Sequence, residues 1–277
     1  MKKRKLLWCV IFLGICACIA LTIMHLNKEA STPVTLPLVD SEYPVATEDD
    51  NYGKENADYY RSVYEKGKEI NEDYAGTVFF ASGLIQQPFV QGSDNSEYLR
   101  QNWQNGQYDE AGTVFMDYEN TMDDQNIILY GHYAYPSYDA SRTMMFTPLA
   151  QLLDETNYST NAVVYMLSEN EIREYRVAAV YLADLSCDAS ACYSPDELQY
   201  NQTSYTEDYF AQYKNAVKER MLYDTGVDFS YEDRLLTLQT CVENRNDERE
   251  IVICKQVDTY PITDTCSFPK REIPPLN

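Results

Sequence analysis

Short runs of β-branched and aromatic residues, separated by turn residues, recur along the chain from residue 76 onward. Runs of this length, bounded by Gly, Asn, Asp and Pro, are typical of β-strands. Their number predicts a single mainly β domain built on one barrel-like antiparallel or mixed sheet. The runs read GTVFFA, LIQQPFVQG, AGTVFMDY, NIILYGH, AVVYMLS, EYRVAAVYLA, LLTLQTCV and EIVICKQV.

Helical spacing of apolar residues marks three further segments. Residues 56–71 place Tyr60, Val63 and Tyr64 on one face, which predicts a short amphipathic helix before the first strand. FTPLAQLLD, residues 146–154, predicts a second helix with Thr147 as its cap and Pro148 in its first turn. An insertion between residues 194 and 223 contains SPDELQY and then YFAQYKNAVKERML, whose apolar residues recur at helical spacing: Phe210, Tyr213, Val217 and Met221.

The N-terminus has the pattern of a membrane anchor. MKKRK at residues 1–5 is followed by LLWCVIFLGICACIALTIM, which carries no formal charge. At a rise of ~1.5 Å per residue this run just spans a hydrocarbon core of ~30 Å. We therefore expect a transmembrane signal anchor over residues 6–26, with the basic tail 1–5 in the cytoplasm and the remainder outside the cell. A cleavable signal, cut near Ala17 or Ala20, is the alternative.

Composition divides the rest of the chain. Residues 27–55 are rich in Pro, Thr, Ser and acidic residues and predict an extended extracellular stalk, followed by one domain over residues 56–277. The chain has 22 basic and 44 acidic residues, a net charge of −22, which argues against a protein that tracks nucleic-acid phosphates. No phosphate-binding loop, HExxH or CxxC zinc pattern is present, so no cofactor or metal is predicted.

Cysteine usage leaves at least one free thiol outside the membrane segment. An odd number of thiols lies beyond it, and Cys187 and Cys192 are close enough for a local disulfide, a possibility that stays open. A free thiol in an exported domain is a candidate nucleophile. The cysteines beyond the membrane segment are Cys187, Cys192, Cys241, Cys254 and Cys266.

Imidazole is scarcer still, because the chain has only His25 and His132. His25 falls at the end of the predicted membrane helix, so His132, which follows NIILYG, is the one histidine available to a thiol outside it. Cys241 ends the strand LLTLQTC, and alternation places it on the face opposite Leu236 and Leu238. Each residue could instead be structural, as a hydrogen-bonded histidine and a buried strand cysteine.

Two arginines follow Cys241 closely. Arg245 and Arg249 precede the run IVIC, so a hairpin or tight loop would return one of them towards the thiol. A guanidinium is always charged and carries several donors, so it can stabilise a developing oxyanion or hold a peptide carbonyl. Either arginine could also be a solvated loop charge.

A colinear set of segments resembles the class B sortases, cysteine transpeptidases of Gram-positive cell surfaces. The set comprises INEDYAGTVFF, LIQQPFVQGSDNSEYLRQNW, AGTVFMDYEN, NIILYGHYAY, MFTPLAQLLD, EDRLLTLQTC and EREIVICK. The resemblance implies a single closed β-barrel with an N-terminal helix and a helix-bearing insertion before the cysteine strand. It identifies His132 as the family histidine, Cys241 as the nucleophile and Arg249 as the family arginine, with Arg245 as the second choice.

The function that this resemblance implies is transpeptidation. Such an enzyme would cleave an NPxTN-like sorting signal after Thr through a Cys241 thioester and pass the acyl group to an amine. The acceptor would be a peptidoglycan precursor or a pilin lysine, and the catalytic domain would sit outside the cell on its membrane helix. A secreted cysteine peptidase is one alternative, although papain-type enzymes have Cys before His. A non-catalytic anchored binding domain, with His132 and Cys241 far apart, is the other.

Overall fold

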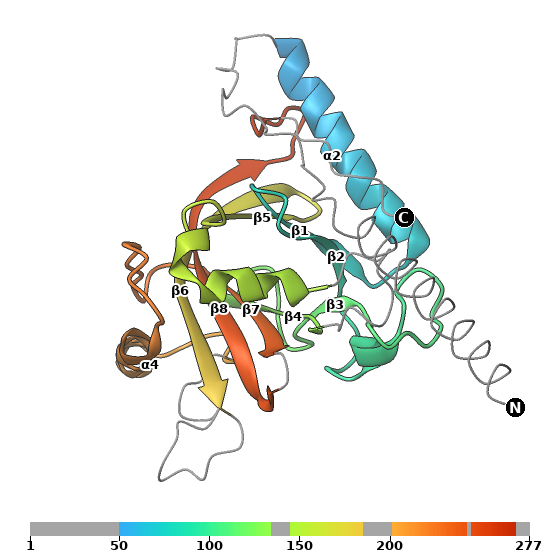
Figure 1. The fold of residues 1–277 in the computed structure, drawn as a ribbon. Helices are drawn as coiled ribbons and strands as arrows, with labels where there is room; N and C mark the ends of the chain where they lie inside the picture. The colour runs from blue at the N-terminus through green and yellow to red at the C-terminus, as the bar shows by residue number, and fades with distance from the viewer. Residues whose placement is uncertain (1–49, 134–144, 185–200, 243–244, 270–277) are drawn as a thin grey trace, which may run out of the picture. The chain divides into compact units, whose positions relative to one another are not determined.

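Eight strands form a closed mixed β-barrel in the computed structural model, which describes residues 50–133, 145–184, 201–242 and 245–269 (Figure 1). Around the barrel the strands follow the order β1-β2-β3-β4-β7-β8-β6-β5. All eight predicted strands are present, so the predicted barrel is confirmed. Their bounds are β1 Tyr74–Phe80, β2 Gln86–Val90, β3 Val114–Met116, β4 Asn126–Tyr130, β5 Val163–Leu167, β6 Glu171–Asp184, β7 Leu235–Val242 and β8 Arg245–Pro261.

The pairing of β4 with β7 is parallel, whereas β8 pairs antiparallel with both β7 and β6. A parallel pair needs a long crossover connection, and here the chain between β4 and β7 includes β5, β6 and the helix-bearing insertion. The consequence is that the C-terminal ends of β4 and β7 lie side by side, although more than a hundred residues separate them.

Alternation along these strands separates the barrel interior from its outer face. Leu236 and Leu238 of β7 belong to the interior cluster, together with Val252 of β8. Leu235 and Ile251 belong instead to a second cluster, outside the barrel. The odd-numbered residues from Leu235 to Cys241 and from Arg249 to Ile253 therefore face outward.

Helix α4 (Glu207–Arg220) covers that outer face and confirms the predicted helix in the insertion. Its N-cap is Thr206, whose side chain accepts a hydrogen bond from the Tyr209 amide. The apolar residues predicted to share a face are the ones that pack on the second cluster: Phe210, Tyr213, Val217 and, partly buried, Met221.

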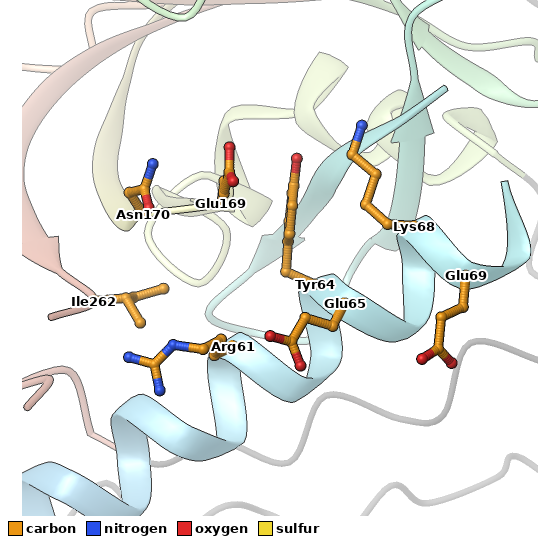
Figure 2. Close-up of a pocket in the computed structure, with 8 residues that line it drawn as sticks. All are labelled: Arg61, Tyr64, Glu65, Lys68, Glu69, Glu169, Asn170 and Ile262. Carbon is orange, nitrogen blue, oxygen red and sulfur yellow. The ribbon is translucent and has the colours of Figure 1, made fainter. Parts of the chain in front are cut away.

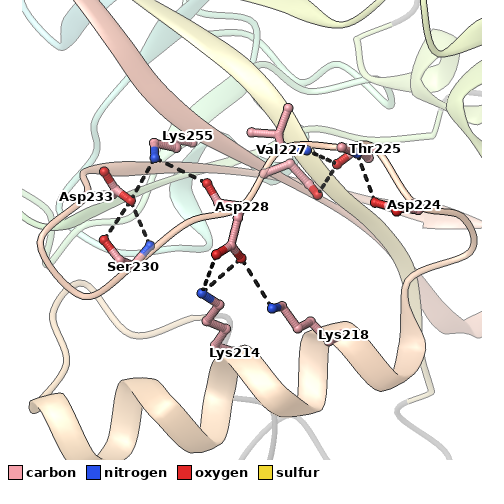
Figure 3. Close-up of polar contacts among 11 residues, drawn as sticks. Lys214, Lys218, Asp224, Thr225, Val227, Asp228, Ser230, Asp233 and Lys255 are labelled. Carbon is pink, nitrogen blue, oxygen red and sulfur yellow. Dashed lines mark hydrogen bonds and ion pairs between the residues drawn. The ribbon is translucent and has the colours of Figure 1, made fainter.

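Ion pairs hold α4 to the segment that leads into β7 (Figure 3). The Asp228 carboxylate lies 2.9 Å from Lys214 Nζ and 3.3 Å from Lys218 Nζ, and Lys255 Nζ of β8 donates to the Asp228 carbonyl at 3.2 Å. The Lys214 hydrogen bond is the main cause of the lowered pKa of the Asp228 carboxyl. Because the Asp228 side chain is 69% exposed, each pair contributes less than about 1 kcal/mol.

Helix α2 (Asp50–Ile70) packs against β1 and begins earlier than the predicted 56–71 helix. Tyr60 on its inner face is fully buried, and Tyr60 Oη donates to the Pro269 carbonyl at 3.0 Å. Asn56 Nδ2 likewise donates to the Phe268 carbonyl at 3.0 Å. The helix thus ties the segment after β8 to the barrel. The predicted division into tail, stalk and outer domain stays a prediction.

The helix predicted over residues 146–154 is a 3₁₀-helix, η2 (Thr147–Leu153), and its N-cap is Phe146 rather than Thr147. Pro148 lies in the first turn, as predicted. Leu149 and Leu152 are both fully buried in the interior cluster. Residues three apart lie directly above one another in a 3₁₀-helix, so this geometry directs both leucines into the barrel. A second short 3₁₀-helix, η3 (Glu155–Asn157), follows.

The prediction of a membrane-spanning helix needs correction. Within residues 50–133, 145–184, 201–242 and 245–269, no helix is both long and apolar enough to cross a bilayer. The segment 6–26 lies outside the described residues. The described residues form a mainly β closed barrel without a membrane-spanning helix, so the predicted single-pass membrane localisation is not supported.

Candidate active site

The topology brings the three predicted site residues to one end of three adjacent strands. Cys241 of β7 lies directly opposite Arg249 of β8 in the antiparallel ladder. On its other side β7 pairs with β4 up to Tyr130, and the Gly131 amide then donates to the Gln239 carbonyl at 3.1 Å. Continuing this parallel register by two residues sets His132 level with Cys241.

Their side chains also share a face. Cys241 and Arg249 are in phase with the outward residues Leu235 and Ile251. His132 is two residues beyond Tyr130 and out of phase with Leu129, which points into the barrel. Imidazole, thiol and guanidinium therefore belong to the outer face at the same end of the barrel.

Burial distinguishes Cys241 from the other thiols in the described part of the chain. Cys241 is half-buried, whereas Cys254 is fully buried in the barrel interior and Cys266 is 1% exposed under α2. Desolvation raises the pKa of the Cys254 thiol far above its usual range and also raises that of Cys266. A nucleophile must ionise and reach its substrate, so Cys241 is the thiol suited to attack. Cys187 and Cys192, with their possible disulfide, lie outside the described residues.

His132 is half-buried and held by a backbone carbonyl. Its Nε2 lies 2.7 Å from the Leu99 carbonyl oxygen at the end of η1 (Glu97–Arg100). Since a carbonyl can only accept, Nε2 carries the proton and Nδ1 is the ring atom left for other partners. Burial lowers the pKa of His132; the Leu99 bond raises it in opposition, and the charges of Arg100 and Arg249 lower it further.

Gly131, directly before His132, is required by close packing rather than by a turn. A Cβ at this position would lie 2.6 Å from the Phe146 ring, which is itself buried in the barrel interior. The Phe146 amide also donates to the His132 carbonyl at 3.2 Å. The start of η2 thus fixes the backbone of the histidine that follows β4.

The structure places the two candidate arginines differently. Arg249 is directly across the ladder from Cys241, and its Nη1 donates to the Glu248 carbonyl at 3.1 Å. The backbone of Arg245 pairs one residue further on, with Val242, beyond an irregularity in the ladder. The position of Arg249, and its charge acting on His132, favour Arg249.

A solvent-accessible pocket of about 650 Å³ lies elsewhere, between α2 and the β5–β6 turn. None of the three predicted site residues lines it. Figure 2 shows side chains of both charges around it: Arg61, Tyr64, Glu65, Lys68, Glu69, Glu169, Asn170 and Ile262. No group of three or more His, Cys, Asp and Glu side chains in the described segments is placed to hold a metal ion.

Two features of this region escaped sequence reasoning. The Leu99 carbonyl reaches His132 across 33 positions of sequence, and backbone atoms carry no residue-specific signal. Glu250, next to Arg249, is 1% exposed in the barrel interior. The alternation that exposes Arg249 on the outer face predicts an inward Glu250, so that signal was present.

Comparison with known proteins identifies a family for the chain. Residues 84–257 match the family model described as Sortase domain. Sortase B of Listeria monocytogenes is 28% identical over 184 residues, covering 66% of this chain and 68% of the relative. The crystal structure of Clostridium perfringens sortase B has a TM-score of 0.58 at 27% identity, covering 70% of this chain and 99% of that one. A Staphylococcus aureus sortase B–substrate complex has a TM-score of 0.60 at 21% identity, covering 75% and 95%, and shows likeness of fold alone.

The chain therefore belongs to the sortase domain family, because the family model matches more than half of the chain. Its relatives and structural neighbours are class B sortases, and it is a cysteine transpeptidase of the sortase type. The resemblance stated from the sequence is confirmed.

Proposed function

We propose that this enzyme cleaves a C-terminal sorting signal after Thr through a thioester on Cys241 and transfers the acyl group to an amine. One observation carries the proposal: Cys241, His132 and Arg249 converge at one end of β4, β7 and β8, on the same outer face of the barrel. A thiol, an imidazole and a guanidinium are the groups that acyl transfer through a thioester needs.

Each residue has one role in the forward step. The Cys241 thiolate attacks the Thr carbonyl carbon, and Arg249 stabilises the negative oxygen of the tetrahedral intermediate. As the C–N bond breaks, the His132 imidazolium donates its proton to the leaving amine. The product is the thioester.

In the second step His132 acts as a base instead of an acid. The acceptor amine attacks the thioester carbonyl while neutral His132 takes its proton, and the C–S bond then breaks to release the Cys241 thiolate. The lowered pKa of His132 makes the neutral ring its main form near pH 7. Neutral imidazole suits this base role.

The donor we propose is an NPxTN-like sorting signal, and the acceptor is the amine of a peptidoglycan precursor, with a pilin lysine as the second possibility. The direct test is to incubate the enzyme with an NPxTN-like peptide and triglycine or a lysine peptide, and to identify products by mass spectrometry. We expect an amide between the Thr carbonyl and the added amine. Hydrolysed peptide alone, at every amine concentration, would instead identify a peptidase; no thioester on Cys241 with any sorting peptide would refute the proposal.

Replacing Arg249 should slow acyl transfer strongly, and Arg245 offers a matched control. We expect Arg249→Ala to lower kcat/KM roughly 10²-fold or more, the usual cost of losing one oxyanion donor. Arg245→Ala removes the same charge from the same hairpin and should cost far less. The steady-state rates of both variants with one peptide and one amine check this assignment, and a larger loss in Arg245→Ala would reverse it.

A further inference from the structure

We infer that the backbone carbonyl of Leu99, supported from behind by Gly112, is the element that positions the His132 ring, and that Gly112 is a positioning residue for the reaction. This inference rests on the proposed acid–base role of His132. It adds a residue that contacts neither substrate nor thiol.

The contact itself is specific. The Leu99 carbonyl is among the last of η1, where helix carbonyls have no partner within the helix. It is therefore available to accept from His132 Nε2 at 2.7 Å. This bond fixes both the tautomer and the direction of the ring, and so decides which nitrogen is left for proton transfer.

Gly112 makes this arrangement possible. Its φ of +60° lies in the left-handed region, and a Cβ there would be 2.4 Å from the Leu99 oxygen and 2.7 Å from the Tyr98 oxygen. No real Cβ approaches a carbonyl oxygen so closely, so any side chain at position 112 must displace the carbonyl that holds His132. The Thr113 amide donates to the Tyr98 carbonyl at 3.1 Å and keeps the two segments together.

The far side of the loop is anchored as well. Tyr98 is 2% exposed, and its hydroxyl donates to Asp73 Oδ2 at 2.6 Å. Asn71 Nδ2 donates both to Tyr98 Oη at 3.0 Å and to the Trp103 carbonyl at 2.8 Å. A loop tied on both sides cannot absorb a shift at position 112, so the shift passes to the Leu99 carbonyl.

The test compares two glycines of the same loop in the full chain. Gly106 has a φ of +67°, but a Cβ there would meet nothing within 4 Å. Gly106→Ala therefore introduces the same backbone strain without the clash. We expect Gly112→Ala to lose roughly 10²-fold in kcat with little change in KM, as when a catalytic group is misplaced by about 1 Å. Gly106→Ala should stay close to wild type.

A second readout is independent of activity. The His132 imidazole can be titrated by NMR, with His25→Gln used to separate the two histidine signals. Because the Leu99 bond raises the pKa of His132 against burial and the charges of Arg100 and Arg249, its loss in Gly112→Ala should lower that pKa. Gly106→Ala should leave it unchanged. An inactive wild-type enzyme would refute the proposed function and leave this readout standing.

A milder variant covers the case in which Gly112→Ala does not fold. Tyr98→Phe keeps the buried ring and removes the hydroxyl that anchors the loop to Asp73 and Asn71. We expect the same direction of change in kcat and in the His132 titration, to a smaller extent. If neither variant alters the His132 titration relative to Gly106→Ala, the inference is wrong.

Discussion

A Cys241→Ala variant should form no covalent acyl-enzyme and should transfer no peptide to an amine. The expected loss is complete because the thiolate is the attacking group and alanine cannot replace it. Peptide mapping of the enzyme after incubation with a sorting peptide should locate the thioester on Cys241 in the wild type and on no cysteine in the variant.

Two other thiols supply matched controls. Cys254→Ala and Cys266→Ala should both retain acyl transfer, because these sulfurs are buried and their raised pKa keeps them protonated. Each should lose stability on the order of 1 kcal/mol through the small cavity left in its cluster. A thioester found on either residue would overturn the assignment of the nucleophile.

Glu250→Gln should stabilise the protein at alkaline pH by several kcal/mol. Glu250 is 1% exposed in the barrel interior, and its Oε1 has no hydrogen-bond partner among the described residues. Opposite it in the ladder is Thr240, whose hydroxyl also has none there. Desolvation raises the pKa of Glu250 from its ordinary value of 4.5 to about 8.

The sign of the pH dependence follows from proton binding. Between pH 4.5 and pH 8 the folded state keeps the Glu250 proton while the unfolded state loses it, so the free energy of unfolding falls as pH rises. Each pKa unit corresponds to about 1.4 kcal/mol, and the loss is complete above pH 8. Glutamine has the same shape and no charge to lose, so Glu250→Gln should remove this decline.

Denaturant unfolding at several pH values measures the effect. Glu232→Gln removes one negative charge from an exposed position just before β7 and serves as the control. The difference between wild type and Glu250→Gln should grow from near zero at pH 5 to its largest value above pH 8. Equal pH profiles for the two glutamine variants would show that Glu250 is solvated in the folded protein.

Local pattern was sufficient for most elements of the fold. Runs of β-branched and aromatic residues between turn residues located all eight strands, and helical spacing placed Phe210, Tyr213 and Val217 on the buried face of α4. At η2 it located the helix but not its 3₁₀ geometry, because a spacing of three, as between the buried Leu149 and Leu152, fits both kinds of helix. The N-cap is Phe146 rather than the predicted Thr147.

The predicted membrane helix rested on hydropathy alone. An apolar run states only that a segment could cross a bilayer, and no helix in the described residues does so. The membrane localisation was built on that one run. The described residues thus give that localisation no support, whereas the sortase assignment is supported by many separate segments.

By itself the sequence determined the strands, the scarcity of imidazole and the family, and through them the candidates His132 and Cys241. Tertiary structure decided what depends on neighbours distant in the chain. The β7–β8 register places Arg249 rather than Arg245 opposite Cys241. Complete burial excludes Cys254 as the nucleophile. The hydrogen bond between His132 and the Leu99 carbonyl was likewise decided by the tertiary structure. Strand pairing, burial and such backbone hydrogen bonds form between segments that no local sequence pattern connects.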